Sequence, residues 1–229
     1  MTLTTRRLLC LLLVAIPAGV AAGQADERPS TVGPPGGLFG SIYALDGPAW
    51  TVLFGAADAG SLPIVFGAAP VLAIGRWVEG DGRYDDAWRA GLSVTIGLGL
   101  STAIKHAVHR GRPFVGLPGV TAKSRYVGAR HLDRYSFPST HATLAAALAT
   151  SLALSHQEWY VMAPAAVWVG AVGVSRVWLG VHYPGDVVTG WALGAAVAWT
   201  IHRLGDRLTP VGLKGPVIRT PPPILSVRF

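Results

Sequence analysis

The stretch HATLAAALATSLALS, residues 141–155, decides the fold class of this chain, because alanine and leucine dominate it. These two residue types favour helices, and the run is longer than a typical strand. Four further apolar segments accompany it in the sequence, at residues 50–74, 90–104, 159–175 and 187–201. We therefore predict an all-α protein, a helical bundle of five to six apolar helices.

The composition favours a bundle that spans a membrane. Of the 229 residues, 51% are hydrophobic and 14% are charged, whereas soluble domains carry about 25% charged residues. Three of the segments are shorter than the ~20 residues of a typical membrane-spanning helix, so each is borderline alone. Helices that cross alternately, with the mature N-terminus outside, would place several arginines on the cytoplasmic side, as the positive-inside tendency requires. The basic loop at residues 110–141 violates that tendency, so either this topology is wrong or the cations of the loop bind an anion. A soluble periplasmic bundle with buried apolar helices is the alternative.

The first 25 residues are typical of an export signal, with Arg6 and Arg7 before an apolar core and small residues after it. An uncleaved first membrane helix is the alternative. Residues 26–48 are rich in proline and glycine, which predicts an irregular exported arm. The helical domain then covers residues 49–207, and an extended tail covers residues 208–229. The single cysteine, Cys10, lies in the apolar run, so the chain forms no internal disulfide.

The net charge of +7 predicts an anionic partner, such as a phosphorylated compound or a lipid headgroup. No basic run with interleaved aromatic residues is present, so we expect no nucleic-acid partner.

The first polar cluster is KHAVHRGRP, residues 105–113. Lys105 and Arg112 are seven positions apart, a spacing that predicts one face of a helix. Lysine supplies a point charge, and the arginine fork matches two phosphate oxygens. By itself the cluster is also explained by basic residues that complement a helix dipole.

The second cluster is FPSTHAT, residues 137–143. Ser139 or Thr140 is placed to cap the following helix, whose first backbone N–H groups can bind an anion. His141 follows at this positive helix end, where it can deliver a proton. An ordinary capping sequence with a chance histidine is the alternative.

The third cluster is SRVWLGVHYPGD, residues 175–186. Arg176 ends one apolar helix, and His182 follows in a short loop. Asp186 begins the next helix, where it can cap the helix and accept a hydrogen bond from the imidazole. A histidine held in this way has a defined tautomer and suits a nucleophile or a base. A capping aspartate beside an interfacial histidine is the alternative.

Alternating helices bring all three clusters to the same end of the bundle. Together they supply three cations, neutral donors and two histidines, the set that a tetrahedral oxyanion needs. Histidines on opposite sides of a phosphorus atom can attack it and protonate the leaving oxygen. We therefore expect no metal and no cofactor, because the cations carry the charge compensation.

In this order and spacing, the three clusters resemble the signature of the type 2 phosphatidic acid phosphatase superfamily, K-x6-R-P, P-S-G-H and S-R-x5-H-x3-D, over roughly residues 50–205. The resemblance implies a helical bundle and a phosphohistidine intermediate. It assigns His182 as nucleophile, Asp186 as its orienting group and His141 as general acid. The residues implied to hold the phosphoryl oxygens are Lys105, Arg112, Ser139 and Arg176. The family usually has glycine at position 140. Thr140 keeps the backbone N–H that glycine supplies, but its side chain changes the shape of the pocket.

The predicted function is that of a metal-independent phosphatase for a lipid phosphate or diphosphate, in the bacterial inner membrane with its site facing the periplasm. Three alternatives stay open: a soluble periplasmic non-specific acid phosphatase, a non-catalytic protein that binds anionic headgroups, and a vanadate-dependent haloperoxidase.

Overall fold

A computed structural model describes residues 35–80, 82–123 and 134–214. These residues form helices and contain no strand, which confirms the all-α prediction. Each of the five predicted segments lies within one long helix. The long helices are α3 (Pro48–Glu79), α4 (Asp85–Val108), α6 (Thr140–Ser155), α7 (Trp159–Trp178) and α8 (Pro184–Arg203). The short ones are α2 (Gly37–Tyr43), α5 (Pro113–Gly116), α9 (Gly205–Leu208) and the 3-10 turn η1 (Val211–Leu213).

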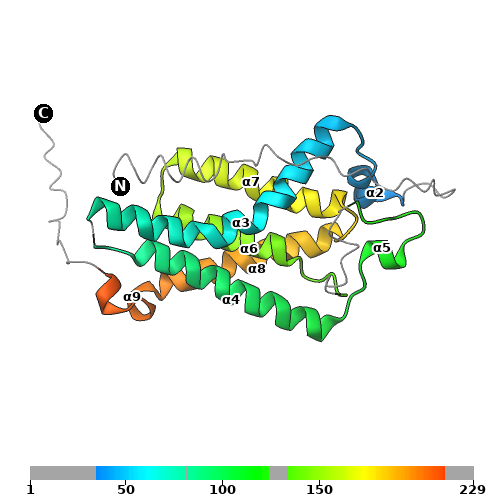
Figure 1. The fold of residues 1–229 in the computed structure, drawn as a ribbon. Helices are drawn as coiled ribbons and strands as arrows, with labels where there is room; N and C mark the ends of the chain where they lie inside the picture. Colours follow the sequence, from blue (N-terminus) through cyan, green and yellow to red (C-terminus); the bar gives the residue numbers. More distant parts are fainter. Residues whose placement is uncertain (1–34, 81, 124–133, 215–229) are drawn as a thin grey trace, which may run out of the picture.

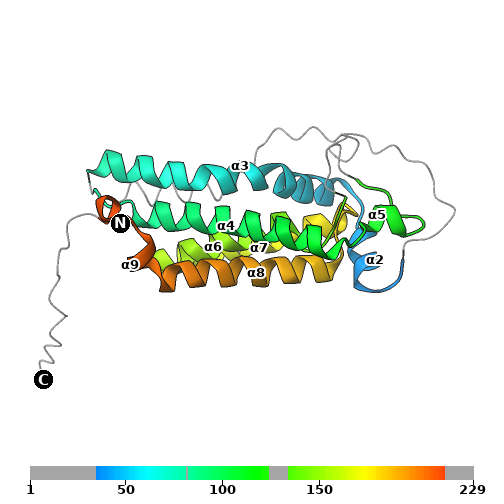
Figure 2. The ribbon, with the colours of Figure 1, turned by 90° about the horizontal axis from the view of Figure 1, so that it is seen from below.

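Helix α6 is the centre of the bundle and contacts α3, α4, α7 and α8 (Figures 1 and 2). Its small side chains let neighbouring backbones approach closely. The closest approach is made by α8, where a Cβ atom on Gly194 would lie 2.1 Å from the carbonyl oxygen of Thr143. The alanine-rich sequence that predicts this helix therefore also allows the neighbouring helices to pack closely around it.

Helix α3 is continuous over 32 residues but bends near its middle (Figure 1). Pro63 lies inside it, and a proline within a helix removes one backbone hydrogen bond and pushes against the preceding turn. The chain therefore bends here within one helix.

Among the described residues, two helices, α3 and α7, are long and apolar enough to cross a membrane. Both carry large apolar side chains on their outer faces: Trp77 is 73% exposed and Val167 is also 73% exposed. Outward-facing residues of this kind match a hydrocarbon environment, whereas in water they form an exposed apolar surface.

The chain outside the five long helices differs in part from the expectation. Helix α2 lies within residues 26–48, which we expected to be irregular, and η1 lies within the predicted tail. The predicted export signal, with Cys10, lies outside the described residues. Helices α2 and α5 lie at one end of the bundle and α9 lies at the other (Figure 1).

Candidate active site

The first cluster lies at the end of α4, but not on a single helical face as predicted. Helix α4 ends at Val108, and His109 takes a left-handed conformation with φ of 55°. The chain therefore turns before Arg112, which is buried, as is Lys105. Lys105 Nζ donates to the carbonyl oxygen of Tyr135 at 3.0 Å, and Arg112 Nη1 donates to that of Val181 at 3.1 Å.

The second cluster begins α6, as predicted. Ser139 is the N-cap, and its hydroxyl oxygen accepts from the backbone N–H of Ala142 at 3.5 Å. The backbone N–H of Ser139 donates to the carbonyl oxygen of Asp186 at 3.0 Å, so the second and third clusters are joined directly. Thr140 and His141 are the first two residues of the helix.

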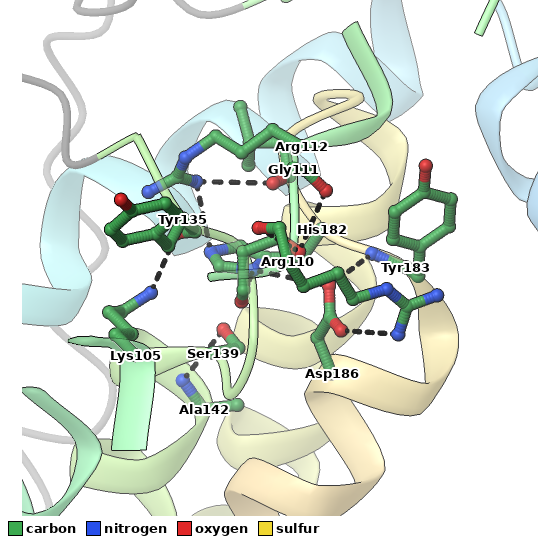
Figure 3. Close-up of polar contacts among 12 residues, drawn as sticks. Lys105, Arg110, Gly111, Arg112, Tyr135, Ser139, Ala142, His182, Tyr183 and Asp186 are labelled. Carbon is green, nitrogen blue, oxygen red and sulfur yellow. Dashed lines mark hydrogen bonds and ion pairs between the residues drawn. The ribbon is translucent and has the colours of Figure 1, made fainter. Parts of the chain in front are cut away.

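The third cluster connects α7 and α8. Arg176 is in the last turn of α7, His182 lies in the connection, and Asp186 is in the first turn of α8. The backbone N–H of Tyr183 donates to Asp186 Oδ2 at 2.9 Å, which confirms that Asp186 caps this helix. Its other oxygen, Oδ1, accepts from Arg110 Nη1 at 2.8 Å (Figure 3).

The ring of His182 differs from the expectation in its Nδ1 partner. Nδ1 lies 2.7 Å from the main-chain oxygen of Ser136 and 3.7 Å from Asp186 Oδ2. The shorter distance is a hydrogen bond, whereas the longer one is too long for one. The predicted hydrogen bond from the imidazole to Asp186 is therefore replaced by one to a backbone carbonyl. On the other side of the ring, Nε2 lies 3.2 Å from Arg112 Nη1 (Figure 3).

The positive charges of the site surround His182, whose side chain is 2% exposed. Burial lowers the pKa of His182 well below its usual value, and the positive charges of Arg112, Arg176 and Lys105, with His141, lower it further. The imidazole is therefore neutral at physiological pH. The structure thus brings cations from α4, the loop after it and α7 to one histidine.

Three residues near this site were not predicted as part of it: Asp58, Arg110 and Ser136. Asp58 of α3 pairs with Arg176 of α7; the arginine is buried and the aspartate is partly buried. A signal for Asp58 existed in the sequence, since it is the single charge in the apolar segment 50–74. Arg110 and Ser136 gave no such signal, because their roles depend on the turn after α4.

Within the described residues, no group of three or more His, Cys, Asp or Glu side chains could hold a metal ion. The polar groups gathered around His182 are mainly cations and donors, a set that suits an anion.

Comparison with known proteins identifies the family. The model of the PAP2 superfamily matches residues 86–210, which include all three clusters. This chain belongs to the PAP2 superfamily. It is 31% identical to undecaprenyl-diphosphatase BcrC of Bacillus subtilis over 53% of this chain and 58% of that protein. It is 35% identical to decaprenylphosphoryl-5-phosphoribose phosphatase of Mycobacterium tuberculosis over 51% of this chain and 59% of that one.

Both of these matches cover less than two thirds of the relative's length. The fold is similar to that of a transmembrane PAP2 type phosphatidylglycerolphosphate phosphatase from Bacillus subtilis. The alignment with that crystal structure covers 92% of this chain and 100% of the other chain, with a TM-score of 0.51 and 23% sequence identity. This likeness supports the helical fold.

Proposed function

We propose that this PAP2 protein is a membrane phosphatase that hydrolyses a lipid phosphate or diphosphate through a phosphohistidine intermediate. The observation that carries the proposal is the environment of His182: a buried, neutral imidazole whose Nε2 faces Arg112 at 3.2 Å, among the charges of Lys105 and Arg176.

In the first step, Nε2 of His182 attacks the phosphorus atom of the substrate. Arg112 is always protonated and can only donate, so the nitrogen that faces it carries a lone pair. A new N–P bond forms while the P–O bond to the leaving group breaks. Before substrate binds, burial and the charges of Arg112 and Lys105 lower the pKa of His141 to about 4. The negative charge of the bound phosphate raises this pKa again, so His141 is protonated in the complex. It donates this proton to the departing oxygen, and the lipid alcohol or lipid phosphate leaves as a stable product.

In the second step, His141, now neutral, takes a proton from a water molecule on the opposite side of the phosphorus. The water oxygen bonds to phosphorus, the N–P bond breaks, and inorganic phosphate is released. His182 returns to its neutral form and His141 is again protonated, so the cycle closes without a net change in the protein.

The remaining residues of the site stabilise negative charge on the phosphoryl oxygens. We assign this role to Lys105, Arg112 and Arg176, with the Ser139 hydroxyl and the backbone N–H of Thr140 as neutral donors. Such donors are effective in a buried site, because they are positioned before the reaction begins. Thr140 keeps the N–H that glycine would supply and adds a side chain that glycine lacks.

The substrate class is inferred from the relatives and from the outer surface of the bundle. The two relatives described above are named as an undecaprenyl-diphosphatase and a decaprenylphosphoryl-5-phosphoribose phosphatase. Helices α3 and α7 can cross a bilayer, so the site at the bundle end would lie near the depth of lipid headgroups. We place this end at the periplasmic face of the inner membrane.

The test is phosphate release by the purified full-length protein in detergent. The substrates are undecaprenyl diphosphate, phosphatidate and the water-soluble p-nitrophenyl phosphate. We expect hydrolysis of the lipids and a loss of about a thousandfold or more in His182→Ala, as for other catalytic nucleophiles. The control is His202→Ala, which removes a histidine at the opposite end of α8. Near-normal release by His182→Ala would refute the mechanism, and release from p-nitrophenyl phosphate alone would refute the lipid substrate.

A further inference from the structure

We propose that Ser136 is a positioning residue for His182: its main-chain carbonyl, fixed by hydrogen bonds to the turn after α4, selects the ring tautomer. The inference rests on the proposed function, in which Nε2 of His182 is the attacking atom.

The tautomer follows from the chemistry of the two partners of the ring. A carbonyl oxygen only accepts hydrogen bonds, so Nδ1, which lies 2.7 Å from the Ser136 oxygen, must carry the proton. An arginine only donates, so Nε2, which lies 3.2 Å from Arg112, must carry the lone pair. Both contacts require the same neutral form, protonated at Nδ1.

The Ser136 carbonyl is itself held in place by the turn that follows α4. The backbone N–H of Ser136 donates to the carbonyl oxygen of Arg110 at 2.7 Å, and its hydroxyl donates to that of Gly111 at 3.0 Å. Gly111 and Tyr135 form an antiparallel bridge beside them. Ser136 is fully buried, so water does not compete for these hydrogen bonds.

Asp186 is less well placed for this role, because both of its oxygens have closer partners. Oδ2 accepts from the Tyr183 N–H at 2.9 Å and Oδ1 accepts from Arg110 at 2.8 Å, whereas His182 Nδ1 is 3.7 Å away. The Ser136 carbonyl, and not the carboxylate, therefore aims the ring and fixes its proton.

The turn after α4 contacts both Ser136 and His182. Residues 110–112 hold the nucleophile from two sides: the carbonyl oxygens of Arg110 and Gly111 fix Ser136, and Arg112 faces Nε2. A shift of this turn would therefore move the proton acceptor and the phosphate-binding cation together.

The experiment measures the ring nitrogens of His182 by ¹⁵N NMR, with histidine-labelled full-length protein in detergent and without substrate. Comparison with His182→Ala assigns the signals. We expect the wild type to be protonated at Nδ1 only, and Asp186→Asn to keep this tautomer. In Ser136→Ala, which removes the hydroxyl bond to Gly111, we expect a second tautomer to become detectable.

Steady-state kinetics provide a second measurement. The loss of one neutral hydrogen bond predicts a kcat reduced about two- to tenfold in Ser136→Ala, with KM nearly unchanged. The matched control is Ser93→Ala, since Ser93 is equally buried, donates to the Arg89 carbonyl at 2.7 Å and lies in α4 away from the site. It should keep the wild-type kcat.

A wild-type ring protonated at Nε2 would overturn the inference, and so would a tautomer that changes in Asp186→Asn but not in Ser136→Ala. Asp186→Ser, whose hydroxyl can cap α8, replaces the asparagine variant should that protein not fold. The tautomer is measured without substrate, so this result does not depend on whether the protein releases phosphate. The proposed function is tested separately, by the phosphate-release assay described above.

Discussion

Arg176 of α7 and Asp58 of α3 form an ion pair in which the two side chains are 6% and 12% exposed. The pair joins a proposed phosphate-binding arginine to the only acidic residue of an otherwise apolar helix segment. A buried guanidinium needs a compensating anion, and before substrate arrives Asp58 supplies it. The phosphoryl group would then share the arginine with Asp58.

Asp58→Asn should destabilise the empty protein more than the anion-bound one. Removing one partner of a buried pair leaves the other charge uncompensated, which predicts a loss of about 3 kcal/mol in the free energy of unfolding. Orthovanadate, as a phosphate analogue, would restore a negative partner to Arg176. Thermal unfolding in detergent should therefore show a larger vanadate-induced rise in Tm for Asp58→Asn than for the wild type.

The control for this prediction is Asp46→Asn, which removes an exposed carboxylate near the same end of the bundle. It should change neither the Tm nor the vanadate response. Equal vanadate responses in Asp58→Asn and the wild type would show that the pair is unconnected with anion binding.

Arg110→Gln should lower the free energy of unfolding, because Arg110 contacts Asp186 in the first turn of α8. Asp186 is fully buried and accepts from Arg110 at 2.8 Å, and the Arg110 guanidinium also lies 4.1 Å from the centre of the Tyr183 ring. Because the Arg110 side chain is 43% exposed, solvent screening reduces the effect, and we expect a loss of about 1 kcal/mol. Urea unfolding measures it, with Arg207→Gln, an exposed arginine near the other end, as control. A loss no greater than that of Arg207→Gln would contradict the prediction.

The sequence was informative where structure depends on neighbouring residues. The five apolar segments became helices, and the caps at Ser139 and Asp186 form as their local sequence predicts. The helical face proposed for Lys105 and Arg112 was wrong, because His109 takes a left-handed conformation and ends α4 early. Gly111 and Pro113 indicate that a helix ends in this cluster, but nothing in the sequence indicates that the turn begins ahead of them, at His109.

The partners of the site residues could not be predicted for a related reason. Asp58 and Arg176 are 118 positions apart, Arg110 and Asp186 are 76 apart, and Ser136 and His182 are 46 apart. Such contacts depend on how the helices pack and on main-chain atoms that every residue type carries. A backbone carbonyl that orients a histidine therefore cannot be recognised from the sequence.

Gly194→Ala should destabilise the bundle and reduce activity. The added Cβ atom would lie 2.1 Å from the carbonyl oxygen of Thr143, so α8 must move away from α6. Overpacking of this kind costs about 1–3 kcal/mol. The movement also separates Asp186 from Ser139, which are joined by a 3.0 Å hydrogen bond.

The matched control is Gly170→Ala, because a Cβ atom on this helical glycine meets nothing within 4 Å. Alanine there should be neutral or stabilise the protein by up to ~1 kcal/mol through its higher helix propensity. Thermal unfolding of both variants measures the difference. An unchanged Tm in Gly194→Ala would mean that α6 and α8 tolerate separation.

The proposed orientation predicts which end of the bundle is accessible from outside the inner membrane. Val115 of α5 is 69% exposed at the end that carries the site, and Arg83 is exposed in the loop at the opposite end. In a Cys10→Ser background, Val115→Cys should react with a membrane-impermeant maleimide in intact spheroplasts. Arg83→Cys should react only after the membrane is opened. The reverse labelling pattern would place the site in the cytoplasm.

The pH dependence of the protein should reflect the depressed pKa of His182. Burial and the nearby cations keep this imidazole neutral as the pH falls through 6.5, its usual value. The acid limb of kcat/KM, which reports groups of the free enzyme, should therefore lie below pH 6.5 for His182. The unfolded chain binds a proton near pH 6.5 and the folded chain does not, so stability is full above this pH and is lost below it.

One histidine of this kind contributes a slope of at most about 1.4 kcal/mol per pH unit to the free energy of unfolding. Urea unfolding between pH 7.5 and about 5 measures it, and His182→Asn should have a shallower slope than the wild type over this range. His106→Asn, which changes an exposed histidine of α4, should keep the wild-type slope. Bound phosphate would offset the cations and raise the pKa of His182, so saturating phosphate should also flatten the dependence. Equal slopes for the wild type and His182→Asn would show that folding does not lower the pKa of His182.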